Sequence, residues 1–303
     1  MARRKEQADY MRKRRVNPDY LRILELPSAL RYEAFCEADF GEIDVLVLAV
    51  PSKHYRSAIA TIADSLPIGI RILSLTKGLD PLTGARLSEL LQDRLGHLHP
   101  SIAVLSGPNH AEEVALRQPT ATVISSIDLE YARMLQAAIS NESFRAYMNA
   151  DVTGVELAGV VKNVVALATG MSDGLGYGDN ARAALITRGL AEMSRFGQAH
   201  DADPRTFAGL AGLGDLVATC TSGHSRNRLA GDLLAQGHSP EQLEAEMHMV
   251  AEGLVAAPLV LSRARALGIE MPITENVVAV VEGGKDPRDC VSDLMSRQPR
   301  EEH

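Results

Sequence analysis

Residues 151–180 constrain the fold more than any other stretch of this 303-residue chain. From Val155 onward, apolar and small residues recur at steps of three and four and also fill most positions between them. This pattern predicts a helix that is apolar nearly all round, and such a helix must lie in the interior of a domain. One lysine, Lys162, stands in its middle, and a glycine-rich turn with Asp173 and Asp179 follows.

The side chain of Lys162 can adopt one of two arrangements on a buried helix. Its four-carbon stem can carry the ammonium group out to water, or the amine can stay inside, where desolvation lowers its pKa toward the range of a general base. Periodicity alone favours the first alternative. Evidence for a catalytic lysine therefore has to come from the rest of the chain.

The first half of the chain alternates short apolar runs with helical segments, which is typical of a parallel sheet with crossover helices. The predicted strands are 44–50, 71–75, 102–105, 121–125 and 144–147, and the predicted helices include 54–65, 84–95, 111–116 and one that Asp128 caps. The first three strands each end in small or polar residues, at 51–52, 76–78 and 106–109. Parallel strands end at one edge of the sheet, where doubly wound folds bind ligands.

Beyond about residue 150 the strand signals stop, and the chain is predicted to be all helix. Asp203, Ser239 and Asp286 each precede a proline, which places an N-cap before a first-turn proline, and Gln242 completes a capping box with Ser239. The fold class is therefore α/β in residues 1–150 followed by an all-α domain in residues 151–303. A tight interface built on the helix of Lys162 is expected between them.

Composition excludes several classes of protein. No apolar run approaches the roughly 18 unbroken residues of a membrane span. A net charge of -8 argues against general nucleic-acid binding, despite a basic stretch within residues 3–15. Three cysteines, Cys36, Cys220 and Cys290, lie far apart, which indicates neither a disulfide framework nor a metal site. This cysteine usage fits a reducing cytoplasm.

Two motifs in the second half carry weak chemical signals when taken singly. Asp215 and Thr219 lie four residues apart at a glycine-hinged helix start, so they share a helix face. Residues 224–228 (HSRNR) open another helix, where exposed N–H groups and an arginine suit a phosphate. Each also has an ordinary structural interpretation, as a solvated acid near a helix cap and as a surface arginine.

The sequences of the motifs and their order along the chain are together more specific than any single motif. The chain contains the following motifs in order: SLTKGL with Lys77, LSGPNHAEEV with Gly107, ELAGVVKNVVALATGMSDGLGYGDNARAALITRGLAEM with Lys162, GLAGLGDLVATCTS with Asp215, SRNR with Arg226, and VAEGL at 250–254. From about residue 6 to residue 297 the chain closely resembles the bacterial NAD(P)-dependent glycerol-3-phosphate dehydrogenase family.

The resemblance implies reversible hydride transfer between NAD(P)H and dihydroxyacetone phosphate, which gives sn-glycerol 3-phosphate for phospholipid synthesis. It makes Lys162 the proton-transfer residue. During reduction the carbonyl oxygen gains negative charge, and a nearby ammonium group stabilises that oxygen and then protonates it. The resemblance therefore favours the buried alternative for Lys162.

The resemblance also implies binding roles, with no metal among them. Asp215 and Thr219 would contact substrate hydroxyls, whereas Ser225, Arg226 and Asn227 would hold the phosphate. The full substrate-binding set would be Lys77, Gly107, Asn109, Asp215, Thr219, Ser225, Arg226 and Asn227. The cofactor-binding set would be Arg3, Arg15, Lys77, Ala111, Arg226, Val250 and Glu252. Position 109 is more often serine in the family, and asparagine keeps a hydrogen-bonding side chain there.

The glycine-rich dinucleotide turn of the family is missing from this sequence. A Gly-x-Gly-x-x-Gly element would follow a first strand and open a helix. The chain resembles the family only from the end of the second strand, so about 30 residues, one strand-helix-strand unit, are absent at the front. We therefore expect an N-terminally truncated Rossmann-type doubly wound sheet with an exposed central edge. Either the start has been assigned too late, or the chain is a remnant that binds nucleotide poorly.

Two functional hypotheses follow. The first is a cytoplasmic dehydrogenase that uses NAD(H) or NADP(H) on a small phosphorylated substrate. The sequence does not indicate which cofactor is preferred, because the segment that determines the preference is largely missing. The second is a non-catalytic phosphometabolite-binding or oligomerising remnant that has lost dinucleotide binding. The oligomeric state is open, a homodimer included. Triose-phosphate binding without NAD(P)H oxidation would separate the two hypotheses.

Overall fold

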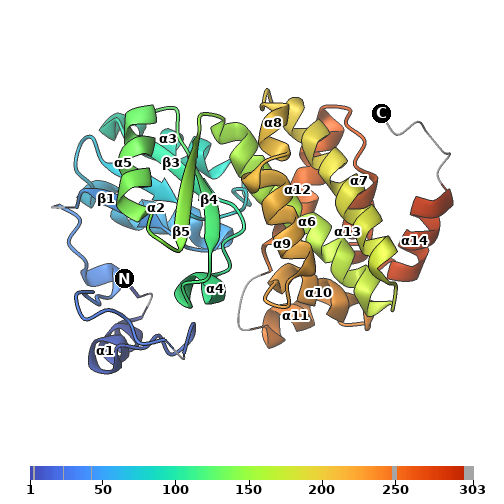
Figure 1. The fold of residues 1–303 in the computed structure, drawn as a ribbon, viewed down its shortest axis with the longest axis horizontal. Coiled ribbons are helices and arrows are strands. Elements are labelled where there is room, and N and C mark those ends of the chain that lie inside the picture. The colour runs from blue at the N-terminus through green and yellow to red at the C-terminus, as the bar shows by residue number, and fades with distance from the viewer. Residues whose placement is uncertain (3, 23, 42, 248–250, 297–303) are drawn as a thin grey trace.

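The computed structural model of the chain describes residues 1–296 apart from positions 3, 23, 42 and 248–250. A sheet flanked by helices lies at one end of the molecule and a group of packed helices lies at the other (Figure 1). The N-terminal helix α1 (Lys5–Arg14) lies below the sheet in this view. Short 3-10 segments occur at Phe35–Glu37, Ala63–Ser65 and Gly96–Leu98.

The sheet has five strands in the spatial order of the sequence: β1 (Val45–Leu48), β2 (Arg71–Ser74), β3 (Ser101–Ser106), β4 (Thr120–Ser125) and β5 (Phe144–Asn149). The first three are parallel, so their carboxyl ends share one edge, as predicted. Among the described strands β1 pairs with β2 alone and forms one border of the sheet. The family resemblance predicts an exposed edge at this strand.

The direction of β4 differs from the prediction of a parallel sheet, because β4 runs antiparallel to β3. The connection between them contains only α4 (Ala111–Ala115), a helix of 5 residues. At about 1.5 Å per residue it spans roughly 8 Å, whereas a strand of 6 residues such as β3 spans roughly 20 Å. The chain therefore does not return across the sheet, and β4 starts from the edge at which β3 ends.

Helices cover both faces of the sheet. On one face α2 (Ser52–Ile62) and α3 (Leu87–Leu95) pack against β1 and β2, with Tyr55 and Leu91 fully buried. On the other face α5 (Leu129–Ile139) packs against β3 and β4. Asp128 caps α5 as predicted, because its Oδ1 accepts a hydrogen bond from the N–H of Tyr131 at 3.0 Å.

After Asn149 the described chain contains helices and no strand. The longest is α6 (Val152–Gly174), which Asp151 caps. The others are α7 (Asp179–Gln198), α8 (Pro204–Phe207), the π-helical turn η4 (Leu210–Gly214), α9 (Asp215–Thr221), α10 (Arg226–Ala235), α11 (Pro240–Glu246), α12 (Glu252–Ala266), α13 (Pro272–Val281) and α14 (Pro287–Ser296). Ser239 and Gln242 form the predicted capping box at α11.

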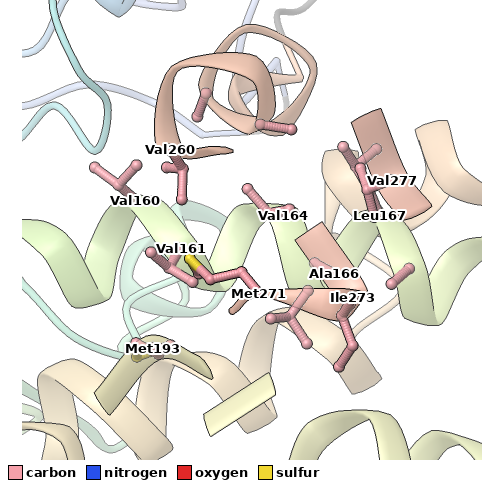
Figure 2. Packing of buried hydrophobic residues seen from close by; sticks show 14 of the residues in the cluster. Val160, Val161, Val164, Ala166, Leu167, Met193, Val260, Met271, Ile273 and Val277 are labelled. Atoms are coloured by element: carbon pink, nitrogen blue, oxygen red, sulfur yellow. The ribbon is translucent and has the colours of Figure 1, made fainter. Parts of the chain in front are cut away.

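The helix α6 is the centre of this helical half, as its sequence predicts. Every residue from Leu157 to Ser172 is buried. Figure 2 shows Val160, Val164 and Leu167 of α6 packed among side chains of α12 and α13. By length and composition α6 could cross a membrane, but 89% of its most apolar stretch is buried inside the protein. It is therefore the core helix of the helical half.

The first turns of α6 also join the two halves. Glu156 accepts hydrogen bonds from the N–H of Ser88 at 2.9 Å and from Arg86 Nη1 at 2.8 Å, both at the start of α3. Nearby, Arg263 Nη1 of α12 donates to the carbonyl oxygen of Gly84 at 2.6 Å. These contacts fix the helical half against the sheet, and the ends of the parallel strands then face the middle of α6.

Candidate active site

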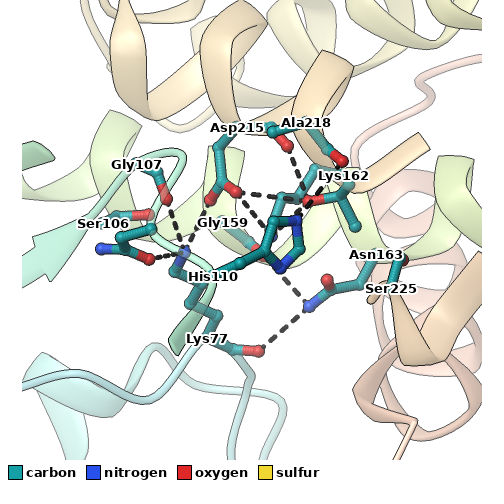
Figure 3. A network of polar contacts seen from close by, with 12 residues as sticks. Lys77, Ser106, Gly107, His110, Gly159, Lys162, Asn163, Asp215, Ala218 and Ser225 are labelled. Atoms are coloured by element: carbon teal, nitrogen blue, oxygen red, sulfur yellow. Dashed lines mark hydrogen bonds and ion pairs between the residues drawn. The ribbon is translucent and has the colours of Figure 1, made fainter. Parts of the chain in front are cut away.

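Lys162 lies on α6 opposite the ends of the parallel strands, and a network of polar contacts surrounds it (Figure 3). Its Nζ donates to Asp215 Oδ1 at 2.8 Å and to Thr219 Oγ1 at 2.7 Å. The side chain is only 7% exposed. The amine therefore stays inside, and the snorkelling alternative is wrong.

Burial sets the acidity of Lys162. Desolvation lowers the pKa of this ammonium group to about 8, and the nearby charge of Lys77 lowers the pKa further, whereas Asp215 acts in the opposite direction. A pKa in that range allows the same amine to give up and regain a proton near neutral pH.

Asp215 lies between two ammonium groups. Its Oδ1 faces Lys162, and its Oδ2 accepts a hydrogen bond from Lys77 Nζ at 2.7 Å. Burial acts to raise the pKa of Asp215, but Lys162 and Lys77 outweigh that effect and hold the pKa below its usual value. Thr219, one helical turn later, donates its hydroxyl proton to the Asp215 carbonyl at 2.6 Å, which leaves a lone pair for Lys162. The predicted pair on one face of α9 thus holds the catalytic candidate.

Lys77 follows β2 at the sheet edge and is fixed by the loop after β3. Besides Asp215, its Nζ donates to the carbonyl oxygen of Gly107 at 3.0 Å and to Asn109 Oδ1 at 3.2 Å. All three protons of the ammonium group are therefore used within the protein. Gly107 has φ +139°, and a Cβ there would lie 3.1 Å from the Cα of Thr122, so this close approach favours glycine.

The predicted phosphate-binding residues stand at the start of α10. Ser225 caps the helix through a hydrogen bond from the Arg228 N–H to its Oγ at 3.2 Å. Arg226 is exposed, and its guanidinium group has no hydrogen bond to any described residue. Asn227 is turned inward: its Nδ2 donates to Asn163 Oδ1 at 2.8 Å, and its Oδ1 accepts from the N–H of Gly253 at 2.9 Å. Only one amide proton of Asn227 then remains for a ligand.

Two residues of the network were not predicted from the sequence. Asn163 donates to the carbonyl oxygens of Gly159 at 3.2 Å and of Lys77 at 3.3 Å, so it links α6 to the sheet edge. His110 belongs to the network drawn in Figure 3, with its Nε2 3.4 Å from the carbonyl oxygen of Ala218. The available signal for Asn163 was a second polar side chain directly after Lys162 in an apolar run.

The predicted cofactor-binding residues are less closely gathered. Glu252, the first residue of α12, contacts the N-terminus of α2. Its carboxylate accepts hydrogen bonds from the N–H of Ser52 at 2.9 Å and from the Ser52 hydroxyl at 2.5 Å. Ala111 is exposed at the start of α4. Arg15 ends α1 and pairs with Glu25, so the contacts described for it lie within the N-terminal segment. Arg3 and Val250 lie outside the described residues.

The residues around the first turn of α2 are compatible with a bound dinucleotide. The carboxylate of Glu252 and the first turn of α2 lie together at the strand edge, where doubly wound folds bind dinucleotides. Gly78 allows the backbone to lie close to Ser52 and Glu252, because a Cβ on it would lie 2.5 Å from the Cβ of Ser52 and 3.0 Å from Glu252. The glycine-rich turn that would receive the pyrophosphate is not in this sequence.

Comparisons with known proteins cover both halves. A family model described as the N-terminus of NAD-dependent glycerol-3-phosphate dehydrogenase matches residues 1–132, and one described as its C-terminus matches residues 151–292. A glycerol-3-phosphate dehydrogenase (NAD(P)+) of Geobacillus kaustophilus is 47% identical over 301 residues, which are 99% of this chain and 87% of that protein. One from Salinibacter ruber is 46% identical over 303 residues, 100% of this chain and 88% of that protein.

Solved structures agree with the sequence comparisons. The crystal structure of glycerol-3-phosphate dehydrogenase from Coxiella burnetii superimposes with a TM-score of 0.93 at 37% identity, and the match covers 97% of this chain and 90% of that one. The corresponding enzyme of Saccharomyces cerevisiae gives a TM-score of 0.79 at 26% identity, over 96% of this chain and 86% of that one. The chain belongs to the NAD-dependent glycerol-3-phosphate dehydrogenase family.

Proposed function

We propose that this chain interconverts dihydroxyacetone phosphate and sn-glycerol 3-phosphate with NAD(P)(H), the sheet half holding the cofactor and the helical half the substrate. The observation that carries the proposal is the buried amine of Lys162, held by a buried carboxylate at the edge where parallel strands end. Such an amine suits a reaction in which a carbonyl oxygen is protonated. We place the reaction in the cytoplasm, where its product feeds glycerophospholipid synthesis.

Lys162 acts on the substrate oxygen. Described residues use two of its three protons, which leaves the third to donate to the carbonyl oxygen of dihydroxyacetone phosphate. Asp215 and Thr219 hold the amine in that direction. NAD(P)H, when bound, would supply the hydride to the carbonyl carbon. Lys162 transfers its proton to the oxygen, which completes the secondary alcohol, and recovers a proton from water; in the reverse direction the neutral amine takes the proton of the hydroxyl.

Ser225 and Arg226 supply the other end of the substrate site. A dianionic phosphate at the N-terminus of α10 would accept hydrogen bonds from exposed backbone N–H groups and from the guanidinium group of Arg226. Lys77 has its three protons committed to the protein, so we assign it to fixing Asp215 and adding positive charge beside the substrate oxygen.

The test is oxidation of NADH and of NADPH by the purified 303-residue chain with dihydroxyacetone phosphate as the acceptor. Oxidation that depends on this acceptor, with one or both cofactors, is the expected result. Calorimetric binding of sn-glycerol 3-phosphate without any oxidation would instead support the non-catalytic remnant. If the chain showed no binding of sn-glycerol 3-phosphate and no oxidation of either cofactor, the proposal would be wrong.

The pH dependence of the reaction should follow Lys162. Its pKa is about 8, so kcat/KM for ketone reduction, which requires the ammonium form, is expected to fall as the pH rises through about 8. Alcohol oxidation requires the neutral amine, so its kcat/KM is expected to rise over the same pH range. The Lys162→Arg variant, whose side chain stays protonated, should lose both transitions. Profiles that stay flat across pH 8 in the wild type would contradict the assignment.

A further inference from the structure

Asp173 lies at the end of α6 and binds two arginines from two other helices. Its Oδ1 accepts hydrogen bonds from Arg182 Nη2 at 2.9 Å and Nε at 3.2 Å, and its Oδ2 accepts from Arg228 Nη1 at 2.7 Å. The carboxylate is only 11% exposed, whereas both arginines are about a quarter exposed or slightly more. The proton-transfer chemistry assigned to Lys162 makes no use of this cluster.

Arg228 carries the contact from Asp173 into the segment of residues 222–228, which contains the proposed phosphate-binding residues. Its Nε donates to the carbonyl oxygen of Ser222 at 3.1 Å, and its backbone N–H donates to Ser225 Oγ at 3.2 Å. The same Ser222 carbonyl also accepts the N–H of Ser225 at 3.3 Å. One guanidinium group thus joins Asp173 to the first residue of the turn that leads into Arg226.

Close backbone packing fixes the same segment against α6. A Cβ on Gly170 would lie 2.0 Å from the carbonyl oxygen of Arg228, and one on Gly231 would lie 2.1 Å from the carbonyl oxygen of Leu167. The start of α10 therefore rests on the backbone of the helix that carries Lys162. Asp173, one turn beyond Gly170, adds a charged contact at the side of this crossing where the 222–228 turn begins.

We propose that Asp173 is a positioning residue for phosphate recognition, which acts through Arg228 to hold the 222–228 turn at a fixed distance from Lys162. This proposal rests on the proposed function, because it assumes that the turn binds the substrate phosphate. Fixing both ends of the substrate site to one helix keeps the carbonyl group near the amine while the phosphate is bound. A displacement of about 1 Å in such a site can reduce catalysis by about 100-fold.

The test compares Asp173→Asn with the wild type in calorimetric binding of sn-glycerol 3-phosphate, which requires no turnover. We expect the dissociation constant to rise by about 10-fold, because the neutral amide no longer orients Arg228. In turnover the KM for dihydroxyacetone phosphate should rise and kcat should fall, whereas the KM for NADH should change little. Asp173→Glu, which keeps the carboxylate, should restore part of the affinity.

Arg182→Ala is the matched control. It removes the other arginine from Asp173 without a described contact to residues 222–228, so sn-glycerol 3-phosphate binding should stay within about 2-fold of the wild type. An equal loss in Arg182→Ala, or normal binding in Asp173→Asn, would overturn the positioning role and leave the proposed function standing. A wild type that binds no sn-glycerol 3-phosphate would remove both. Melting temperatures of the variants show whether a loss reflects unfolding.

Discussion

The Lys162→Ala variant is expected to lose turnover by about 100-fold to 10,000-fold, the range that a positioned general acid contributes. The amine is the only group of the described network with both a lowered pKa and a proton left for the substrate. Alanine also leaves Asp215 with Lys77 as its only ammonium partner among the described residues. The KM for dihydroxyacetone phosphate should change less than kcat, because the phosphate end of the site is untouched.

Steady-state kinetics with saturating NADH would measure this loss, with Lys285→Ala as a lysine variant far from the network. Lys285 is bound to Asn276 and Asp293 near α14, so its loss should leave turnover unchanged. The Lys162→Arg variant tests charge against proton transfer, because arginine keeps a cation but does not release its proton. If Lys162→Ala turned over at a near-normal rate, proton transfer would have to be assigned to another group.

The positions of the first three strands were predictable because each is a short apolar run ended by small or polar residues. The second strand was predicted at 71–75 and is observed at Arg71–Ser74. The direction of β4 was not predictable in the same way. It depends on whether the connecting helix is long enough to cross the sheet, and the apolar pattern of a strand is the same in both directions.

The candidate site was predictable as a set of residues but not as a set of contacts. Periodicity left Lys162 undecided, because a buried helix allows either arrangement; its partners Asp215 and Thr219 come from more than 50 positions away. The motif around Arg226 likewise identifies Asn227 without indicating that its amide turns toward Asn163. Such orientations follow from the packing of α10 on α6, which local sequence does not specify.

The Arg226→Ala variant is expected to weaken binding of dihydroxyacetone phosphate by about 2 kcal/mol, roughly 30-fold in KM. Losses for a charge pair extend to about 5 kcal/mol when both groups are fully buried. The exposure of Arg226 at the start of α10 places the expected loss at the lower end, because water screens an exposed pair. The loss should still exceed that of Asp173→Asn, since Arg226 would contact the phosphate itself.

Measurement of KM for the variant, with dissociation constants for sn-glycerol 3-phosphate, would check this value. Arg205→Ala is a suitable control, because Arg205 is 90% exposed and pairs only with the nearby Asp203 among the described salt bridges. Glycerol, which lacks the phosphate, should bind the wild type and Arg226→Ala equally weakly. An unchanged KM in Arg226→Ala would place the phosphate elsewhere. A loss for sn-glycerol 3-phosphate alone would mean that the start of α10 selects phosphorylated substrates, while Lys162 acts on the carbonyl group at the other end.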